Sequence, residues 1–211
     1  FAFNGHGDGQ SHNLYIGEVK SLTLRFNYFH HANIGHQIKS RALTNHILYN
    51  RIMDEKAGNS SYLIDLPDGG LAYVLGNEMQ QGPKTENSTL INYGTNFRNH
   101  PVNGLYIVNN TLVNDRHRGG IFVVNACTVI DVRVANNIMS GNALPLKGKG
   151  AAKRNLTQID PLLMSSSDYE YQLRSKSRAI NRGIDPGEAF DIKLLPQFEY
   201  VHPLRGRPRH N

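Results

Sequence analysis

The feature that most constrains the fold is a short motif that recurs five times along the chain. In each copy, an asparagine follows a strand-like segment and precedes, by two residues, a bulky apolar side chain. Successive asparagines are 23, 27, 33 and 27 residues apart. Repeats of roughly 20 to 50 residues are typical of solenoids, whose repeats pack on their neighbours. The five asparagines are Asn27, Asn50, Asn77, Asn110 and Asn137.

A second set of short strand patterns alternates with these motifs. Two strands in each repeat of about 25 residues, without any sustained helical period, predict an all-β chain folded as a right-handed parallel β-helix of about five to six coils. The second set comprises Asn13–Gly17, Gln37–Ser40, Tyr62–Leu66, Thr89–Tyr93 and Ile121–Val124.

The repeated asparagines are predicted to stack from coil to coil, about 4.8 Å apart, and to exchange side-chain amide hydrogen bonds. This ladder would use five of the 23 asparagines of the 211-residue chain. Beyond it the pattern fades, so we expect β-helix coils over residues 1–142 and a loop-rich tail over residues 143–211 that packs on them. Because no capping segment precedes the first strand pattern, we also expect N-terminal coils to be missing, or supplied by another copy of the chain.

The composition narrows the class of partner. The longest apolar runs are far below the roughly 20 residues of a membrane helix, and the single Cys127 cannot form an internal disulfide. A net charge of +6 favours a polyanionic partner. The basic run Lys39–Arg41 lacks interleaved aromatic residues, so we expect no nucleic-acid partner. The expected partner is an acidic polysaccharide, and the expected location is secreted or periplasmic.

Side chains alternate along a strand, which predicts one exposed polar row on the second strand set. If Ile16, Ile38, Ile64 and Ile91 point inward, their neighbours point outward on adjacent coils. Those neighbours are Tyr15, Lys39, Asp65 and Asn92. Further polar candidates on the same stretches are His36, Arg41, Tyr62, Tyr93 and Arg98.

The stretch from His36 to Asn77 resembles the pectate lyase-like β-helix superfamily, and within it polysaccharide lyases of the chondroitinase B and alginate lyase group. The resemblance covers residues 13–140 at the level of the fold and Lys39-Ser40 at the catalytic level. In that group a lysine before a serine acts as base, and an arginine on the next coil neutralises the uronate. Here Asp65 stands at the second position. The tail resembles the ends of bacterial secreted β-helix proteins.

β-Elimination from a uronate needs a base for the proton next to the carboxylate and a positive charge that stabilises the resulting anion. Asp65 beside Lys39 would keep the lysine protonated, which suits Lys39 to neutralising charge. The base would then be Tyr93, Tyr62, His36 or His31. We therefore predict Lys39, Asp65 and Tyr93 as catalytic residues. The predicted substrate-binding residues are Arg41, Tyr62, His36, Asn92 and Arg98.

Several alternatives remain open at this stage. The same groups would serve a uronate C5-epimerase, or the chain would be a non-catalytic glycan-binding module of the adhesin or tail-spike kind. A hydrolase ranks lower, because Asp65 is the one acid with an obvious place on this face. The resemblance implies calcium, but no acid lies between Glu18 and Asp54, so no cofactor or metal site is predicted. Strand alternation is expected to send His30 and His31 to opposite sides, which separates them as ligands.

Overall fold

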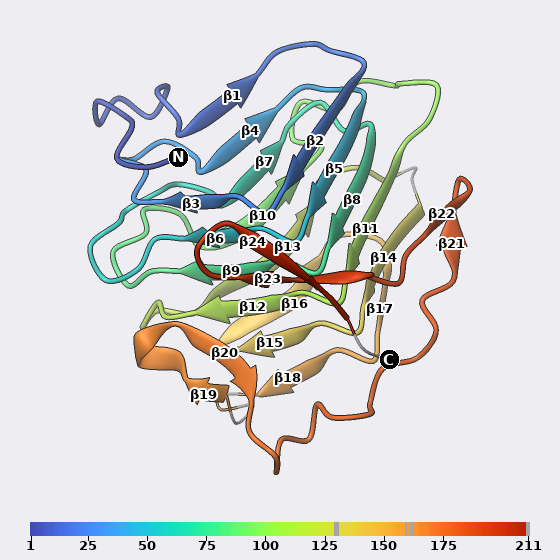
Figure 1. The fold of residues 1–211 in the computed structure, drawn as a ribbon. Coiled ribbons are helices and arrows are strands. Elements are labelled where there is room, and N and C mark those ends of the chain that lie inside the picture. Colours follow the sequence, from blue (N-terminus) through green and yellow to red (C-terminus); the bar gives the residue numbers. More distant parts are fainter. Residues whose placement is uncertain (129–130, 159, 161–162, 210–211) are drawn as a thin grey trace.

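The computed structural model describes residues 1–128, 131–158, 160 and 163–209. Three parallel sheets of six strands each wind into a right-handed parallel β-helix of about six coils (Figure 1). The predicted fold class is confirmed. Each coil contributes three strands where two were predicted; the additional strand, after each ladder asparagine, is only three or four residues long.

The three sheets are named A, B and C, and each is given in order along the stack. Sheet A contains β3 (Tyr28–His30), β6 (Arg51–Met53), β9 (Glu78–Gln81), β12 (Thr111–Asn114), β15 (Ile138–Ser140) and β18 (Leu156–Gln158). Sheet B contains β1 (Leu14–Ile16), β4 (Ile38–Ser40), β7 (Ile64–Leu66), β10 (Thr89–Tyr93), β13 (Gly120–Asn125) and β16 (Ala143–Lys147). Sheet C contains β2 (Ser21–Arg25), β5 (Thr44–Leu48), β8 (Leu71–Leu75), β11 (Gly104–Val108), β14 (Asp131–Ala135) and β17 (Ala151–Lys153).

The corner between sheets C and A is a repeated tight turn. The residue before each ladder asparagine adopts a left-handed conformation, with φ between 55° and 65°. Glycine and asparagine tolerate this conformation best, and three of the six positions carry one of them. The six residues are Phe26, Tyr49, Gly76, Asn109, Asn136 and Arg154.

The asparagine ladder runs through this corner as predicted. Asn77 shows its geometry: its Oδ1 accepts hydrogen bonds from the backbone N–H and the side-chain Nδ2 of Asn50, at 2.8 and 3.1 Å. Its own Nδ2 donates to Asn110 Oδ1 at 3.0 Å and to the carbonyl of Ile47 at 2.8 Å. The same pattern extends to a sixth member, Asn155. The ladder therefore satisfies polar groups inside every coil and fixes the coil register.

The coils continue past the predicted boundary at residue 142. Strands β16, β17 and β18 extend all three sheets to Gln158. The sequence search missed this coil because Asn155 lies only 18 residues after Asn137, closer than any earlier pair. The loop between β16 and β17 is short, so the last coil is the shortest.

The apolar residue two positions after each of the five predicted ladder asparagines points into the coil, as predicted. Each is fully buried in the main core, together with the inward residues of sheets B and C. These residues are Phe29, Ile52, Met79, Leu112 and Met139.

The tail packs on the outside of the coils, and it covers two of the three sheets. Leu163 and Tyr171 pack on Met53 and Val113 of sheet A. Ala189 and Leu194 pack on the aromatic outer face of sheet C. The tail comprises β19 (Leu163–Ser165), η1 (Ser166–Asp168), β20 (Glu170–Leu173), β21 (Glu188–Ala189), β22 (Ile192–Lys193), β23 (Phe198–Val201) and β24 (Arg205–Pro208).

The N-terminal segment partly covers the first coil. Ala2 bridges His30 in parallel, and the Phe1 ring stacks on Phe29 at 4.7 Å. Backbone hydrogen bonds also join residues 1–4 to His30 and Asn33, so a segment lies against β3 where no capping segment was expected. Strands β1 and β2 are the outermost strands of sheets B and C. The expected additional N-terminal coils stay a prediction.

Candidate functional site

The outer face of sheet B carries the predicted polar row, but Asp65 and Asn92 are buried where exposure was predicted. The register pairs Tyr15 with Lys39, Lys39 with Asp65, and Asp65 with Asn92. Farther along the stack, Asn92 pairs with Val124 and Val124 with Lys147. Ile38, Ile64 and Ile91 are fully buried, as the alternation requires. This row, Tyr15 to Lys147, is called the sheet B face.

Asp65 lies at the centre of a compact polar cluster on this face. Its Oδ2 is 3.7 Å from Lys39 Nζ and 3.4 Å from His36 Nε2. Its Oδ1 accepts a hydrogen bond from Asn92 Nδ2 at 2.7 Å. Only 4% of Asp65 is exposed, and burial raises its pKa, opposed by Asn92 and Lys39. Asp65 therefore positions Lys39 and is itself enclosed by its partners.

His36 is held as a neutral imidazole in the same cluster. Its Nδ1 accepts the backbone N–H of Tyr62 at 3.2 Å, so the ring proton lies on Nε2, toward Asp65. The ring stacks between His12 and Tyr62, at centroid distances of 4.5 and 5.0 Å. Burial, with the positive charge of Lys39 nearby, lowers the pKa of His36 to about 3. Since both ring nitrogens are engaged, His36 is a positioning residue and a poor base.

Two arginines meet at the end of the sheet B face. Arg41 pairs with Asp68, and its Nε donates to the hydroxyl of Tyr15 at 3.2 Å. Arg98 lies 3.3 Å from the same Asp68 and 2.6 Å from Glu18. Both predicted binding arginines thus lie beside the row, cross-linked through one buried carboxylate. Tyr15 is 54% exposed and was not among the predicted site residues.

Tyr93 does not reach the sheet B face. Its side chain is fully buried in the core, and its hydroxyl donates to the carbonyl of Gly70. Burial raises the pKa of Tyr93 well above its ordinary value. The prediction that this residue lines the site is wrong, because its neighbour Asn92 points outward and alternation sends Tyr93 inward.

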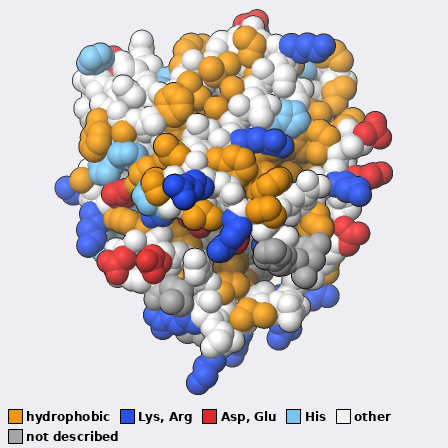
Figure 2. Space-filling view, in the orientation of Figure 1, with side chains coloured by type: hydrophobic (Ala, Val, Ile, Leu, Met, Phe, Trp, Pro, Cys, Tyr) orange, Lys and Arg blue, Asp and Glu red, His pale blue; other side chains and the backbone are white. Residues whose placement is uncertain are grey.

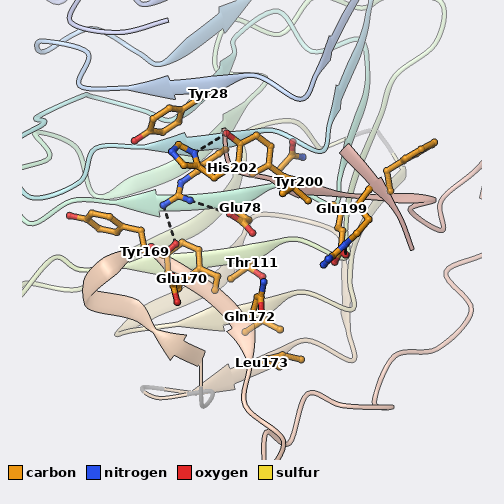
Figure 3. A pocket seen from close by; sticks show the side chains of 18 of the residues that line it. Tyr28, Glu78, Thr111, Tyr169, Glu170, Gln172, Leu173, Glu199, Tyr200 and His202 are labelled. Atoms are coloured by element: carbon orange, nitrogen blue, oxygen red, sulfur yellow. Dashed lines mark hydrogen bonds and ion pairs between the residues drawn. The ribbon is translucent and has the colours of Figure 1, made fainter. Parts of the chain in front are cut away.

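A second candidate site, missed by the sequence analysis, lies over the outer face of sheet A (Figure 3). Its floor is a register row of five consecutive strands, and its walls are tail segments 168–173 and 198–209. The cavity has a volume of about 950 Å³. Acidic, basic and apolar side chains are interspersed over this side of the molecule (Figure 2). The floor residues are Tyr28, Arg51, Glu78, Thr111 and Ile138. This space is called the sheet A cavity.

Glu78 is the most perturbed acid of the sheet A cavity. Burial raises its pKa to about 7, opposed by Arg51 and reinforced by the negative charge of Glu199. Arg51 lies 4.0 Å from Glu78 and donates to the carbonyl of Tyr169 at 3.0 Å, so it links the floor to the tail (Figure 3). The wall residues Tyr200 and His202 share a 3.2 Å hydrogen bond.

His30 and His31 lie together at the N-terminal end of sheet A. Their Nδ1 atoms are 2.9 Å apart. The expectation that they point to opposite sides is wrong, because His31 has φ of 54° and this left-handed residue interrupts the alternation. His31 is thus remote from the sheet B face, and it is removed from the candidate bases there.

No helix within residues 1–128, 131–158 and 163–209 is long and apolar enough to cross a membrane. No protein-family model, no curated protein and no solved structure matches the chain.

Proposed function

We propose that the sheet B face binds an acidic, uronate-containing polysaccharide and cleaves it by β-elimination. The supporting observation is the register of Tyr15, whose phenol is exposed, with Lys39 on the next coil. The described tail residues pack on sheets A and C. The sheet B face is open to solvent at Tyr15 and partly at Lys39, whereas Asp65 and Asn92 are buried. Neighbouring coils about 4.8 Å apart offer repeated contacts to an extended polymer.

In this proposal Lys39 neutralises the uronate carboxylate. Its ammonium group is oriented by Asp65 at 3.7 Å, and Asn92 and His36 hold that carboxylate in turn. A fixed positive charge stabilises the anion that forms when the proton next to the carboxylate leaves. Asp65 is a poor base because both of its oxygens face partners and the group is buried.

Tyr15 is the proposed base. The Nε–H of Arg41 donates to its hydroxyl oxygen at 3.2 Å and fixes the position of the phenol. The phenolate takes the C5 proton, the C4–C5 double bond forms, and the C4–O bond breaks. The leaving oxygen then takes the proton back from Tyr15. Among the earlier candidate bases, Tyr62 remains, but it stacks on His36 and burial raises its pKa.

A polymer of this kind implies a secreted or periplasmic location and a bacterial setting, and both belong to the proposal.

The second candidate function is a non-catalytic glycan-binding module. One observation favours it: Arg41, Arg98, Asp68 and Glu18 already satisfy one another. A C5-epimerase would use the same base and cation without breaking the C4–O bond.

The test incubates the purified chain with alginate, pectate and glycosaminoglycans and follows the ultraviolet absorbance of the unsaturated uronate product. We expect Lys39→Ala to lower the rate about 100-fold or more without changing the far-UV circular dichroism. Tyr15→Phe should abolish cleavage and keep polymer binding. Lys153→Ala, an exposed lysine on sheet C, is the matched control.

Each outcome decides between the candidates. Polymer binding that depends on Lys39, without any product, would support the binding module. Solvent deuterium appearing at C5 without cleavage would support the epimerase. Cleavage that survives Lys39→Ala, or no binding to any of these polymers, would contradict the assignment of the sheet B face.

A further inference from the structure

The strongest unassigned cluster is formed by His30, His31 and Glu55, at the N-terminal end of sheet A. One nitrogen from each imidazole and one carboxylate oxygen all lie within 4.8 Å of one another. We propose that these three side chains bind a divalent transition-metal ion, with Zn²⁺ as the reference ion. This inference is independent of the function proposed for the sheet B face.

The two histidines are brought together by the backbone. His30 is the last residue of β3, and the left-handed conformation of His31 turns the second ring to the same side. Two nitrogens 2.9 Å apart can each lie about 2.1 Å from one ion. Without an ion, one of these two nitrogens must carry a proton and donate it to the other in a hydrogen bond. A metal ion bound by both nitrogens would take the place of that proton.

Glu55 comes from the next coil. His30 is in register with Met53, two residues before Glu55, which carries the carboxylate toward the imidazoles. The Glu55 backbone is fixed by a hydrogen bond from its N–H to Gln80 Oε1 at 2.7 Å. The hydroxyl of Tyr28 donates to the Glu55 carboxylate, and a hydrogen bond of this kind orients a carboxylate that binds a metal.

Aromatic packing fixes both rings. Tyr28 stacks on His30 at 4.3 Å, and Phe3 contacts both imidazoles at 5.2 and 4.8 Å. Rings held in place by neighbours lose little freedom when they bind an ion.

The donor set selects the class of ion. Two imidazoles and one carboxylate suit Zn²⁺ and its first-row neighbours, whereas Ca²⁺ prefers six to eight oxygen ligands. Three protein ligands also leave at least one coordination position for water or a ligand. Tyr28 and Glu55 line the sheet A cavity, so the ion would lie at the border of that cavity.

The test titrates the full chain, stripped with a chelator, with Zn²⁺ in a calorimeter, and follows Co²⁺ substitution by visible absorption. We expect one equivalent of Zn²⁺. Glu55→Gln and His31→Asn should each weaken binding at least 10-fold; asparagine tolerates the left-handed conformation and so preserves the turn. His117→Ala, an exposed histidine in the loop before β13, and His12→Ala, from the other histidine pair, should leave the affinity unchanged.

Glu55→Gln and His31→Asn change residues on different coils. If one of them fails to fold, the other still tests the site. Circular dichroism of each variant separates lost binding from lost structure. Absence of stoichiometric Zn²⁺ binding by the wild-type chain would overturn the proposal, as would binding that neither Glu55→Gln nor His31→Asn weakens. Binding lost in His12→Ala would assign the ion to the other histidine pair and would also overturn it.

Discussion

The sheet B face and the sheet A cavity are built from the same element, one outward register row crossing successive coils. On sheet B the described tail residues do not pack on the row, and its charges pair along the row or with the loops beside it. On sheet A the tail covers the row, and Arg51 and Glu78 interact with residues more than 100 positions away. One solenoid therefore supports a polar face on sheet B and a cavity on sheet A whose walls are tail segments.

Asn77→Ala has the largest expected effect, because the ladder supports both rows. The substitution removes hydrogen bonds to Asn50, Asn110 and Ile47 and leaves buried groups without partners. We expect a loss of more than about 4 kcal/mol in the free energy of unfolding, measured by denaturant titration. Asn99→Ala, on an exposed loop, should stay within about 0.5 kcal/mol of wild type. Equal losses for the two would contradict the role of the ladder.

Tyr171→Ala tests the covered row alone. Tyr171 is buried with Met53, Val113 and Leu163, so its truncation should cost about 3 kcal/mol and loosen the tail. Polymer binding by the sheet B face should survive. The Tyr171 hydroxyl is buried without a hydrogen-bond partner, so Tyr171→Phe should be neutral or stabilising by about 1 kcal/mol. If Tyr171→Ala abolished polymer binding, the two rows would not be independent.

Glu78→Gln tests the electrostatics of the cavity. Burial raises the pKa of Glu78 from 4.5 to about 7, so the folded chain holds a proton that the unfolded chain releases. The stability that this group contributes is present below pH 4.5 and is lost as the pH rises through 7, by about 3 kcal/mol in all. Glu78→Gln should remove this loss, which thermal unfolding at pH 5 and pH 8 would measure. If the stability of Glu78→Gln depended on pH as that of wild type does, Glu78 would be excluded as the source of this dependence.

His36→Asn tests the opposite pH dependence on sheet B. The pKa of His36 is lowered from 6.5 to about 3, so below pH 6.5 the unfolded chain binds a proton that the folded chain excludes. Because of this group, the free energy of unfolding falls by about 1 to 2 kcal/mol as the pH drops from 6.5 to 5. Asparagine can still accept the Tyr62 N–H, so His36→Asn should flatten the profile between pH 7 and 5. A profile as steep as that of wild type would refute the neutral imidazole.

The sequence predicts the periodic part of this molecule and misses the aperiodic part. The ladder, the inward residues and the Lys39–Asp65–Asn92 register follow from local alternation and a regular repeat. Asn155 was not predicted as a ladder residue because its coil is shorter than the others. Tyr93 was misassigned although the same alternation, applied from Asn92, sends it inward.

No local sequence pattern predicts the sheet A cavity. Its floor residues look like ordinary solvated positions of a coil, and their environment depends on how the tail packs. The histidine pair was missed for a different reason, since a single left-handed residue at His31 cancels the alternation on which the prediction depended. Glycine or asparagine commonly signals such a turn, and histidine is a weaker signal.

The most direct test of the account is hydrogen–deuterium exchange of the chain with and without an oligouronate of a polymer that it binds. Slower exchange is expected in β1 and β4, at residues 14–16 and 38–40, and at Arg41, with no change at residues 168–173 and 198–201. Protection confined to the tail segments around the sheet A cavity, with none on the sheet B face, would contradict it.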